Sequence, residues 1–195
     1  QKNEKWKRKP LISIVVPVYN TPQAFLRQMI ESVQSQSYSE WELCIGNASP
    51  ENKELKKTLE EYKKDTRIKE VEIPDNKGIS QNTNRAMEIA SGEWIGLLDH
   101  DDLLAPNALY EIAKAVNECP EAEVVYTDED KVTTDLKEHF QPHLKPDFNL
   151  DLLRSNNYIC HFFVASHDLI SRVGGFRPEF NGAQDYDLIL RCTEQ

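Results

Sequence analysis

The sequence predicts an α/β domain in which a mostly parallel sheet is covered by helices on both faces. Three observations support this fold class. Apolar, β-branched runs alternate along the chain with segments of helical periodicity, which is the pattern of a parallel sheet buried between helices. The 195 residues suffice for one domain with a substantial core. No apolar run approaches the roughly 20 residues that a membrane span needs.

The first strand and the two elements after it have the clearest signals. Residues 11–18 (LISIVVPV) are almost continuously apolar and predict a strand buried on both faces. Thr21-Pro22 predicts a helix start, because threonine caps helices and proline is tolerated at their first position. Residues 41–45 predict a second strand, and Ser49-Pro50 repeats the cap-and-proline signal before a second helix.

The alternation of strand and helix continues as far as residue 126. The expected elements are a strand at 68–73, a helix at 80–90, a strand at 93–98 and a helix at 106–117. Because each strand is followed by a helix, the strands are expected to run parallel and the helices to cover both faces of the sheet.

The pattern changes in the last third of the chain. Residues 127–149 are polar and lack periodicity, and a segment of that length inside a compact domain is usually functional or disordered. We expect a further strand at 158–165, a turn at 174–176 and a helix at 184–195. That helix has no C-cap signal, so we expect the domain to be truncated at its C-terminus.

Charge and cysteine usage narrow the functional classes. The formal charge of −10 disfavours nucleic-acid binding, which requires a basic face. The four cysteines lack C-x-x-C spacing, so neither a zinc site nor a disulfide scaffold is predicted, and reduced thiols fit a cytoplasmic protein. Residues 1–10 hold five basic residues against one acid and are expected to form a tail or linker outside the domain at 11–195. Contact of this tail with anionic lipid, and hence peripheral membrane association, is an alternative.

An apolar strand that runs into a cluster of acids is the strongest functional signal. Residues 93–98 lead directly into Asp99-His100-Asp101-Asp102. Ligands of α/β proteins bind beyond the carboxyl ends of the strands, so these carboxylates could bridge a divalent cation to the phosphates of a nucleotide. A solvated acidic turn before the next helix is the competing interpretation, and the residues alone leave both open.

Three further motifs accompany the acidic one. They are 14–20 (IVVPVYN), 46–49 (GNAS), and 174–176 (GGF) with 184–187 (QDYD). Taken in their order along the chain, the four motifs resemble those of family-two inverting glycosyltransferases with the GT-A fold, which is a Rossmann-like α/β fold. The resemblance covers residues 11–195. It implies transfer of a sugar from a nucleotide-diphosphate donor, expected to be a UDP-sugar. The implied acceptor is a hydroxyl of a saccharide or lipid-linked saccharide in bacterial surface-polysaccharide assembly, at the cytoplasmic face of the cell membrane.

The resemblance also implies a nucleotide site at the strand ends. The residues that match nucleotide contacts are Pro17, Val18, Tyr19, Asn47, Gly78, Asn84, Asp99 and His100. Asn47 stands where the family usually has an aspartate that hydrogen-bonds the base, most often uracil. An amide can accept from a base N–H but adds a donor that a carboxylate lacks, so the identity of the base stays open.

Metal binding and catalysis are assigned by the same resemblance. Asp99 and Asp101 match the D-x-D motif, with Asp101 as the direct ligand of Mg²⁺ or Mn²⁺ and Asp99 nearer the ribose. Asp102 is expected instead to cap the following helix. Asp185 matches the catalytic base, because the attacking sugar hydroxyl must lose its proton on the face opposite the leaving diphosphate. The alternative is that Asp185 and Asp187 are first-turn acids that favour the last helix through its dipole.

Residues 127–131 (TDEDK) resemble a stretch of polysaccharide-building family members. The implied acceptor-binding residues are Asp128, Glu129, Asp130 and Gly175. A charged loop at a strand end is the competing interpretation.

Three histidines remain outside these motifs. His139 and His143 have the i,i+4 spacing of metal ligands, but Pro142 argues against the helix that would align their rings. His161 lies in an apolar run and is expected to be a hydrogen-bonded core or cleft residue rather than a metal ligand.

The absence of other motifs separates the rival functions. Neither G-x-G-x-x-G nor a P-loop occurs, which disfavours dinucleotide enzymes and P-loop kinases. A sugar-phosphate nucleotidyltransferase would need a Gly- and Arg-rich loop after the first strand, and that loop is missing. A non-catalytic module that binds saccharides or nucleotide-sugars is the remaining alternative, because Gly46-Asn47 and Gln184 replace acids of the family pattern.

Overall fold

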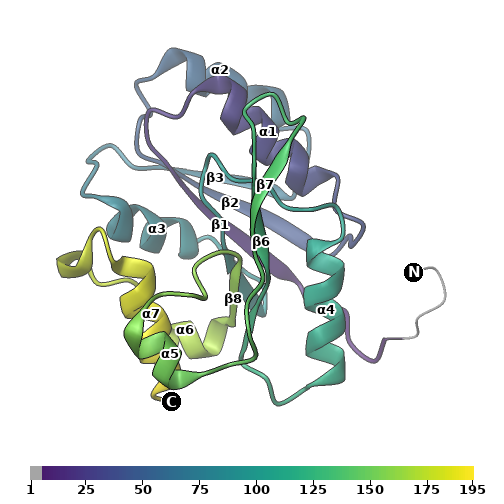
Figure 1. Ribbon diagram of the computed structural model, residues 1–195. Helices are drawn as coiled ribbons and strands as arrows, with labels where there is room; N and C mark the ends of the chain where they lie inside the picture. Colours follow the sequence, from purple (N-terminus) through teal and green to yellow (C-terminus); the bar gives the residue numbers. More distant parts are fainter. Residues whose placement is uncertain (1–5) are drawn as a thin grey trace.

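The computed structural model describes residues 6–195, and its central feature is a six-stranded sheet of order β3-β2-β1-β4-β8-β5 (Figure 1). The first four strands in the chain run parallel and are β1 (Ile12–Val18), β2 (Trp41–Asn47), β3 (Ile68–Glu72) and β4 (Trp94–Leu97). β8 (Phe163–Ser166) lies antiparallel between β4 and β5 (Val124–Tyr126). The predicted mostly parallel α/β sheet is therefore confirmed.

A small second sheet lies in the polar stretch that follows β5. It is the hairpin of β6 (Glu129–Val132) and β7 (His139–His143), which the periodicity of the sequence does not reveal. Its strands are mostly exposed, so their side chains carry no apolar alternation.

Helices cover both faces of the large sheet. Those on one face are α1 (Gln23–Gln34), α2 (Lys53–Tyr62) and α4 (Ala108–Glu118). Those on the other face are α3 (Ile79–Met87), α5 (Leu150–Ser155), α6 (His167–Val173) and α7 (Gln184–Thr193). A 3₁₀ turn, η1 (Pro178–Phe180), precedes α7. Successive residues of β1 point to opposite faces of the sheet, so Ile14 packs toward α1 and Val15 packs toward α3.

Several predicted boundaries are wrong, and at the start of α2 a tertiary contact takes over the predicted capping group. Helix α2 begins at Lys53 with Asn52 as its N-cap, since the Ser49 hydroxyl accepts instead from the Asn20 backbone N–H at 3.0 Å. Pro22, not Thr21, is the N-cap of α1. The strand predicted at 158–165 is shorter, because the chain forms an irregular segment up to residue 162.

The N-terminal segment lies against α4 from Trp6 onward. The Trp6 ring packs against Tyr38 and Tyr110, with centroids 5.5 and 5.0 Å apart, and the Arg8 backbone N–H donates to Asn117. The rest of the predicted basic tail, residues 1–5 with Lys2 and Lys5, lies outside the described residues. All four cysteines are unpaired, as predicted. Across residues 6–195, none of the helices has the length and apolar character that crossing a bilayer requires.

Candidate active site

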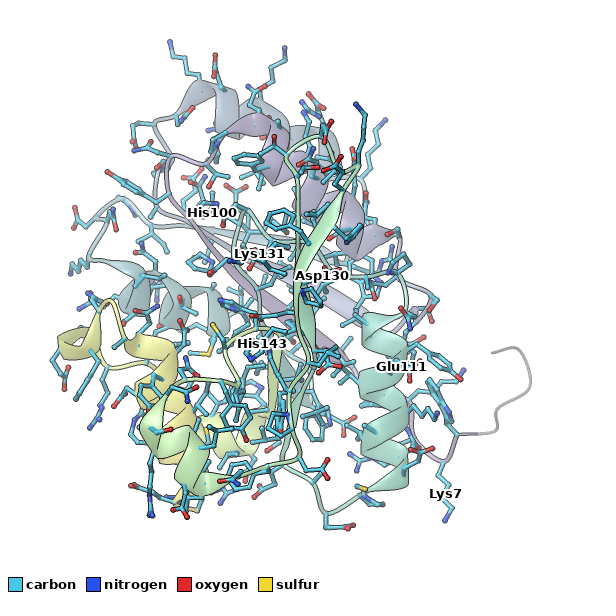
Figure 2. The ribbon with its side chains drawn as sticks, in the orientation of Figure 1. Lys7, His100, Glu111, Asp130, Lys131 and His143 are labelled. Atoms are coloured by element: carbon cyan, nitrogen blue, oxygen red, sulfur yellow. The ribbon has the colours of Figure 1, made fainter. Side chains whose placement is uncertain are left out.

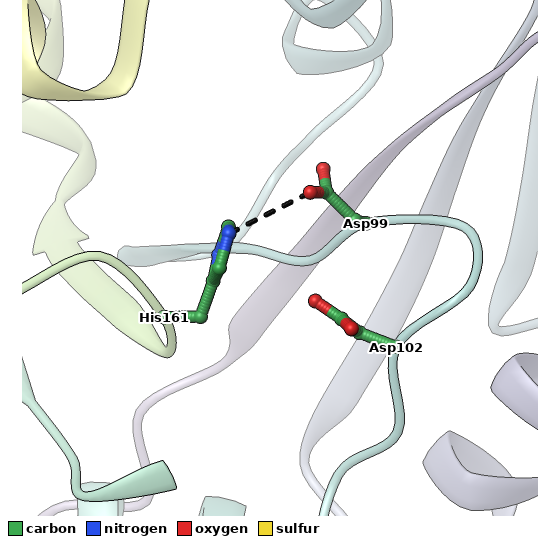
Figure 3. Close-up of side chains that lie close together, drawn as sticks. All are labelled: Asp99, Asp102 and His161. Carbon is green, nitrogen blue, oxygen red and sulfur yellow. Dashed lines mark ion pairs between the residues drawn. The ribbon is translucent and has the colours of Figure 1, made fainter. Parts of the chain in front are cut away.

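Two acids after β4 and one histidine before β8 form the centre of the site. Asp99, Asp102 and His161 bring their ligand atoms within 4.8 Å of one another (Figure 3). The His161 Nε2 lies 3.6 Å from the Asp99 Oδ2. Since two carboxylates and an imidazole converge on one point, this cluster can hold a divalent cation.

Local backbone geometry explains why these side chains meet. The Asp102 backbone N–H donates to the Asp99 carbonyl at 3.2 Å, so the chain turns and both carboxylates face the same side. Gly96 in β4 lets the segment with His161 pass close by, because a Cβ there would collide with the Phe162 ring. The strand-end motif and the distant histidine are thus joined by packing.

The charges of the cluster are coupled. Burial raises the pKa of Asp102, and the carboxylates of Asp99 and Asp101 add to the rise, while His161 acts against it. A hydrogen bond to Cys160 and the charges of Asp99 and Asp102 raise the pKa of His161 to about 9, against the effect of burial. The net rise in the pKa of Asp102 shows that His161 offsets the crowding of negative charge at this turn only in part, and a cation would supply further positive charge.

The prediction that Asp102 caps the next helix is wrong, whereas His161, expected as a core or cleft residue, lies beside the acids. The N-cap of α4 is Asn107, so Asp102 does not cap that helix and is free to join the cluster. The Asp101 side chain is 56% exposed and lies outside the cluster, so its assignment as the direct metal ligand stays a prediction. The sequence signal that could have identified His161 is a single polar ring inside an apolar run next to a strand.

The two acids at the start of α7 have different surroundings. Asp187 is buried and paired with Arg177 and with Arg191, whose Nη2 lies 2.7 Å from the Asp187 Oδ2. Asp185 has no ion-pair partner among residues 6–195 and accepts a hydrogen bond from the Gln184 amide at 2.9 Å. Burial and the charge of Asp99 raise the pKa of Asp185. The helix-stabilising interpretation therefore fits Asp187, whereas the general-base role of Asp185 stays a prediction that its raised pKa does not oppose.

The predicted base contact at the end of β2 has an unexpected neighbour. Asn47 is 1% exposed, its Oδ1 accepts from the Ser49 backbone N–H at 2.9 Å, and its Nδ2 donates to the Glu70 Oε1 at 2.8 Å. Glu70 on β3 thus brings a carboxylate to the position where the family's acid is missing. Sequence reasoning overlooked Glu70, because nothing in its local pattern points to Asn47.

The other predicted nucleotide contacts lie at the carboxyl ends of β1 and β4, just before α3 and within α3. Pro17 and Val18 end β1, and the Tyr19 ring is half-exposed just beyond them. Both polar groups of the Asn84 amide bond to the Phe176 backbone, at 2.8 and 2.9 Å, so Asn84 also holds the 174–176 turn. His100 lies beside Asp101, with its buried Nδ1 lacking a hydrogen-bond partner among the described residues.

A cavity of about 320 Å³ opens beside α3. Its lining includes Asp75, Lys77, Asn82, Asn84 and Arg85. Gly78, with φ of +97°, lies in the turn between these residues, where a side chain would strike Asn181. The cavity adjoins the predicted nucleoside contacts but is not lined by the acidic cluster.

The predicted acceptor acids lie along and just before the hairpin, and each has a hydrogen-bond partner on or after β7. Asp130 contacts the His139 ring at 3.0 Å, and Glu129 contacts His143 at 3.3 Å. Figure 2 labels Asp130 and His143 on this hairpin. The Asp128 carboxylate accepts from the backbone N–H of Lys145 at 2.7 Å.

The two hairpin histidines face different acids on a strand. Among the described residues, no metal-binding cluster includes either of them. Gly175, the remaining predicted acceptor residue, lies against Asn84 with φ of +66°.

Comparison with known protein families assigns the chain to one family. The profile of Glycosyl transferase family 2 matches residues 13–173. The chain belongs to glycosyltransferase family 2. Its central sheet is accordingly that of a GT-A glycosyltransferase domain, as the sequence motifs predicted.

Relatives of this glycosyltransferase domain are much longer than the chain. It is 47% identical over 187 residues to an uncharacterised protein, y4gI, of Sinorhizobium fredii, covering 95% of the chain and 20% of that protein. It is 39% identical over 189 residues to the O-antigen biosynthesis protein RfbC of Myxococcus xanthus, covering 96% and 15%. The chain therefore spans about a fifth or less of these relatives.

Solved structures share the fold of the domain. Staphylococcus aureus TarS 1–349 in complex with UDP-GlcNAc matches with a TM-score of 0.74 at 18% identity, covering 93% of the chain and 53% of TarS 1–349. The mannosyltransferase PcManGT from Pyrobaculum calidifontis, in complex with GDP-Man and Mn²⁺, matches with a TM-score of 0.68 at 19% identity, covering 98% and 56%. At these identities the likeness establishes the GT-A fold.

Proposed function

We propose that the chain is the sugar-transfer domain of a metal-dependent, inverting glycosyltransferase that builds a bacterial polysaccharide from a UDP-sugar. The observation that carries this proposal is the cluster of Asp99, Asp102 and His161, together with the unpaired, raised-pKa carboxyl of Asp185. Resemblance to an O-antigen biosynthesis protein supports the acceptor class, a saccharide or lipid-linked saccharide. The proposal locates the reaction in the cytoplasm, at the inner face of the membrane.

The residues present suit a bound Mn²⁺ better than Mg²⁺. Asp99 and Asp102 offer oxygen ligands, which both ions accept, whereas the imidazole of His161 is a ligand that transition metals take more readily. Such an ion supplies positive charge that neutralises the donor diphosphate and the charge that develops on the leaving group. Asp101, exposed at the same turn, would be the further ligand that its match to the D-x-D motif assigns.

Asp185 has the role of removing the proton of the acceptor hydroxyl. Burial and the charge of Asp99 raise its pKa, which makes the carboxylate a stronger base than an exposed aspartate. The Gln184 amide, 2.9 Å away, holds one oxygen and leaves the other for the hydroxyl. A single base on the face opposite the diphosphate is sufficient for inversion.

The partners of Asn47 support uracil as the base. Glu70 occupies one of the two N–H donors of its Nδ2, which reduces the donor capacity that distinguishes an amide from a carboxylate. Its Oδ1 accepts one backbone N–H and retains a second lone pair for a base N–H. Asn47 and Glu70 together then offer the acceptor that an aspartate would offer alone.

Calorimetry of the chain with UDP, in Mn²⁺ or in a chelator, tests the proposal. We expect UDP to bind at least about tenfold more tightly with Mn²⁺, equivalent to about 1.4 kcal/mol, and Asp99→Asn and Asp102→Asn to abolish the difference. Asp151→Asn, an exposed acid on α5, is the matched control and is expected to leave it unchanged. Equal UDP affinity in Mn²⁺ and chelator would refute metal-dependent donor binding. A non-catalytic binding module would bind UDP in this way but show no sugar transfer.

A further inference from the structure

Lys145 is a buried cation that the proposed mechanism does not use. It follows β7, and its side chain is only 1% exposed. An ammonium group at such a depth is costly unless every N–H is satisfied. Its Nζ donates to the Ile159 carbonyl at 2.6 Å and to the His161 carbonyl, and it pairs with the Glu129 Oε2 at 3.3 Å. Three donors thus meet three acceptors, so the geometry of this lysine is fully determined.

Two of these acceptors belong to the segment that presents His161 to the cluster. The carbonyls of Ile159 and His161 both turn toward one ammonium group, and Cys160 between them has φ of +34°. A non-glycine residue in this region is uncommon and persists only where the surroundings impose it. The Lys145 ammonium is a contact that imposes it, and the imidazole that follows lies 3.6 Å from Asp99.

Lys145 is itself held from the opposite side. Its backbone N–H donates to Asp128 at 2.7 Å, and the next residue, Pro146, accepts from the Tyr126 hydroxyl at 2.7 Å. Because β5 belongs to the central sheet, the ammonium is anchored to the rigid part of the domain and not to the exposed hairpin alone.

We propose that Lys145 is a positioning residue, which holds the backbone at 159–161 so that His161 reaches Asp99 and Asp102. The inference rests on the proposed function, because it assigns Lys145 a role in assembling the cation site. Without the two hydrogen bonds, the segment 159–161 would lose the contact that keeps Cys160 at positive φ. The His161 imidazole would then spend less time beside Asp99 and Asp102. Loss of a group that orients a metal ligand typically weakens metal binding about 10–100-fold.

The chain provides a matched control at the other end of the sheet. Lys69 donates to the Ile89 carbonyl at 3.4 Å and the Ser91 hydroxyl at 3.3 Å, and pairs with Glu42 at 2.6 Å. It therefore links the same kinds of acceptor as Lys145, at the amino end of the strands and away from the cluster. A general loss of stability would follow from replacing either lysine, whereas a loss of metal affinity is expected only for Lys145.

The test is Mn²⁺ binding to the chain, measured by calorimetry and by the signal of free Mn²⁺ in electron paramagnetic resonance, with metal-free melting temperatures recorded in parallel. We expect Lys145→Met to weaken Mn²⁺ binding at least about tenfold, and Lys69→Met to change it less than about twofold. In a His161→Ala background, Lys145→Met should cause no further loss, because it acts through that imidazole.

Each outcome of these measurements either supports or overturns the positioning role of Lys145. Unchanged Mn²⁺ affinity in Lys145→Met, or the same loss in the His161→Ala background, would overturn the positioning role. If Lys145→Met does not fold, Lys145→Gln is tested by the same double-mutant criterion. Its Mn²⁺ affinity is expected to fall at least about threefold, because the shorter neutral amide keeps hydrogen-bond donors but reaches the carbonyls less well. If the wild-type chain binds no Mn²⁺, the proposed function fails together with the inference. If it binds Mn²⁺ and the lysine variants bind equally well, the inference alone fails.

Discussion

Asp185 and Asp187 are two residues apart on α7, yet the structure predicts opposite consequences for replacing them with asparagine. Asp185 is an unpaired carboxyl whose pKa is raised by burial and by Asp99. Asp187 is 6% exposed, and although burial opposes it, the ion pairs with Arg177 and Arg191 lower its pKa. Each variant is therefore the control for the other.

For Asp185→Asn we expect transfer to be nearly eliminated while the melting temperature is unchanged or slightly higher. The amide keeps the size of the carboxyl but cannot take the acceptor proton, and loss of a general base costs about 10²–10⁴ in rate, or about 3–5 kcal/mol. Stability is retained, because the variant removes a charge that burial and Asp99 disfavour. UDP binding should also survive, since the base faces the acceptor.

For Asp187→Asn we expect the reverse. Breaking a fully buried ion pair costs about 3–5 kcal/mol, and the exposure of Arg177 reduces this to about 2 kcal/mol. In a domain of this size such a loss lowers the melting temperature by about 4–8 °C. Transfer per folded molecule should stay close to normal.

Nucleotide release from the donor and differential scanning calorimetry, run on both variants of the protein that carries this domain, provide the two readouts. Near-normal transfer by Asp185→Asn with reduced stability would remove Asp185 from the mechanism and return it to the role of a helix-terminal acid. Loss of transfer in both variants with unaltered melting temperatures would refute the separation of roles.

Three further predictions concern stability, the base and the cluster. Lys69, Ser13 and Ser91 outweigh burial and lower the pKa of Glu42 from 4.5 to about 2, so its stabilisation is complete above pH 4.5 and is lost as the pH falls toward 2. Glu42→Gln should cost about 3 kcal/mol in urea unfolding at pH 7 and little at pH 2, and an equal cost at both would contradict this. Asn47→Asp should weaken UDP binding in calorimetry through repulsion by Glu70, and added Glu70→Gln should restore it; unchanged binding in the single variant would count against their contact. Gly96→Ala should cost about 1–3 kcal/mol and weaken Mn²⁺ binding by displacing Phe162, whereas full Mn²⁺ affinity would show that the ring relaxes elsewhere.

Several features of the domain could be predicted because they depend on neighbours in the chain. Residues 11–18 are apolar enough to be a strand in any globular context, and the periodicity of α1 and α4 marks their buried faces. The position of the acids after β4 also follows from the sequence, since a short apolar run that is predicted to be a buried strand must end where the charged residues begin. These local signals, with the order of the motifs, were sufficient for the fold and the family.

The composition of the cluster was decided by the tertiary structure. Whether Asp101 or Asp102 faces inward depends on the turn that closes between the Asp102 N–H and the Asp99 carbonyl, and no residue type dictates that turn. His161 joins the acids only because the Phe162 ring fits over Gly96 and the Lys145 ammonium holds the preceding backbone. Such contacts join residues far apart in the chain, where sequence spacing carries no information about distance. The sequence alone therefore determined the parallel strands, the helices between them and the places where charge gathers, while packing between distant segments determined which charged side chains meet.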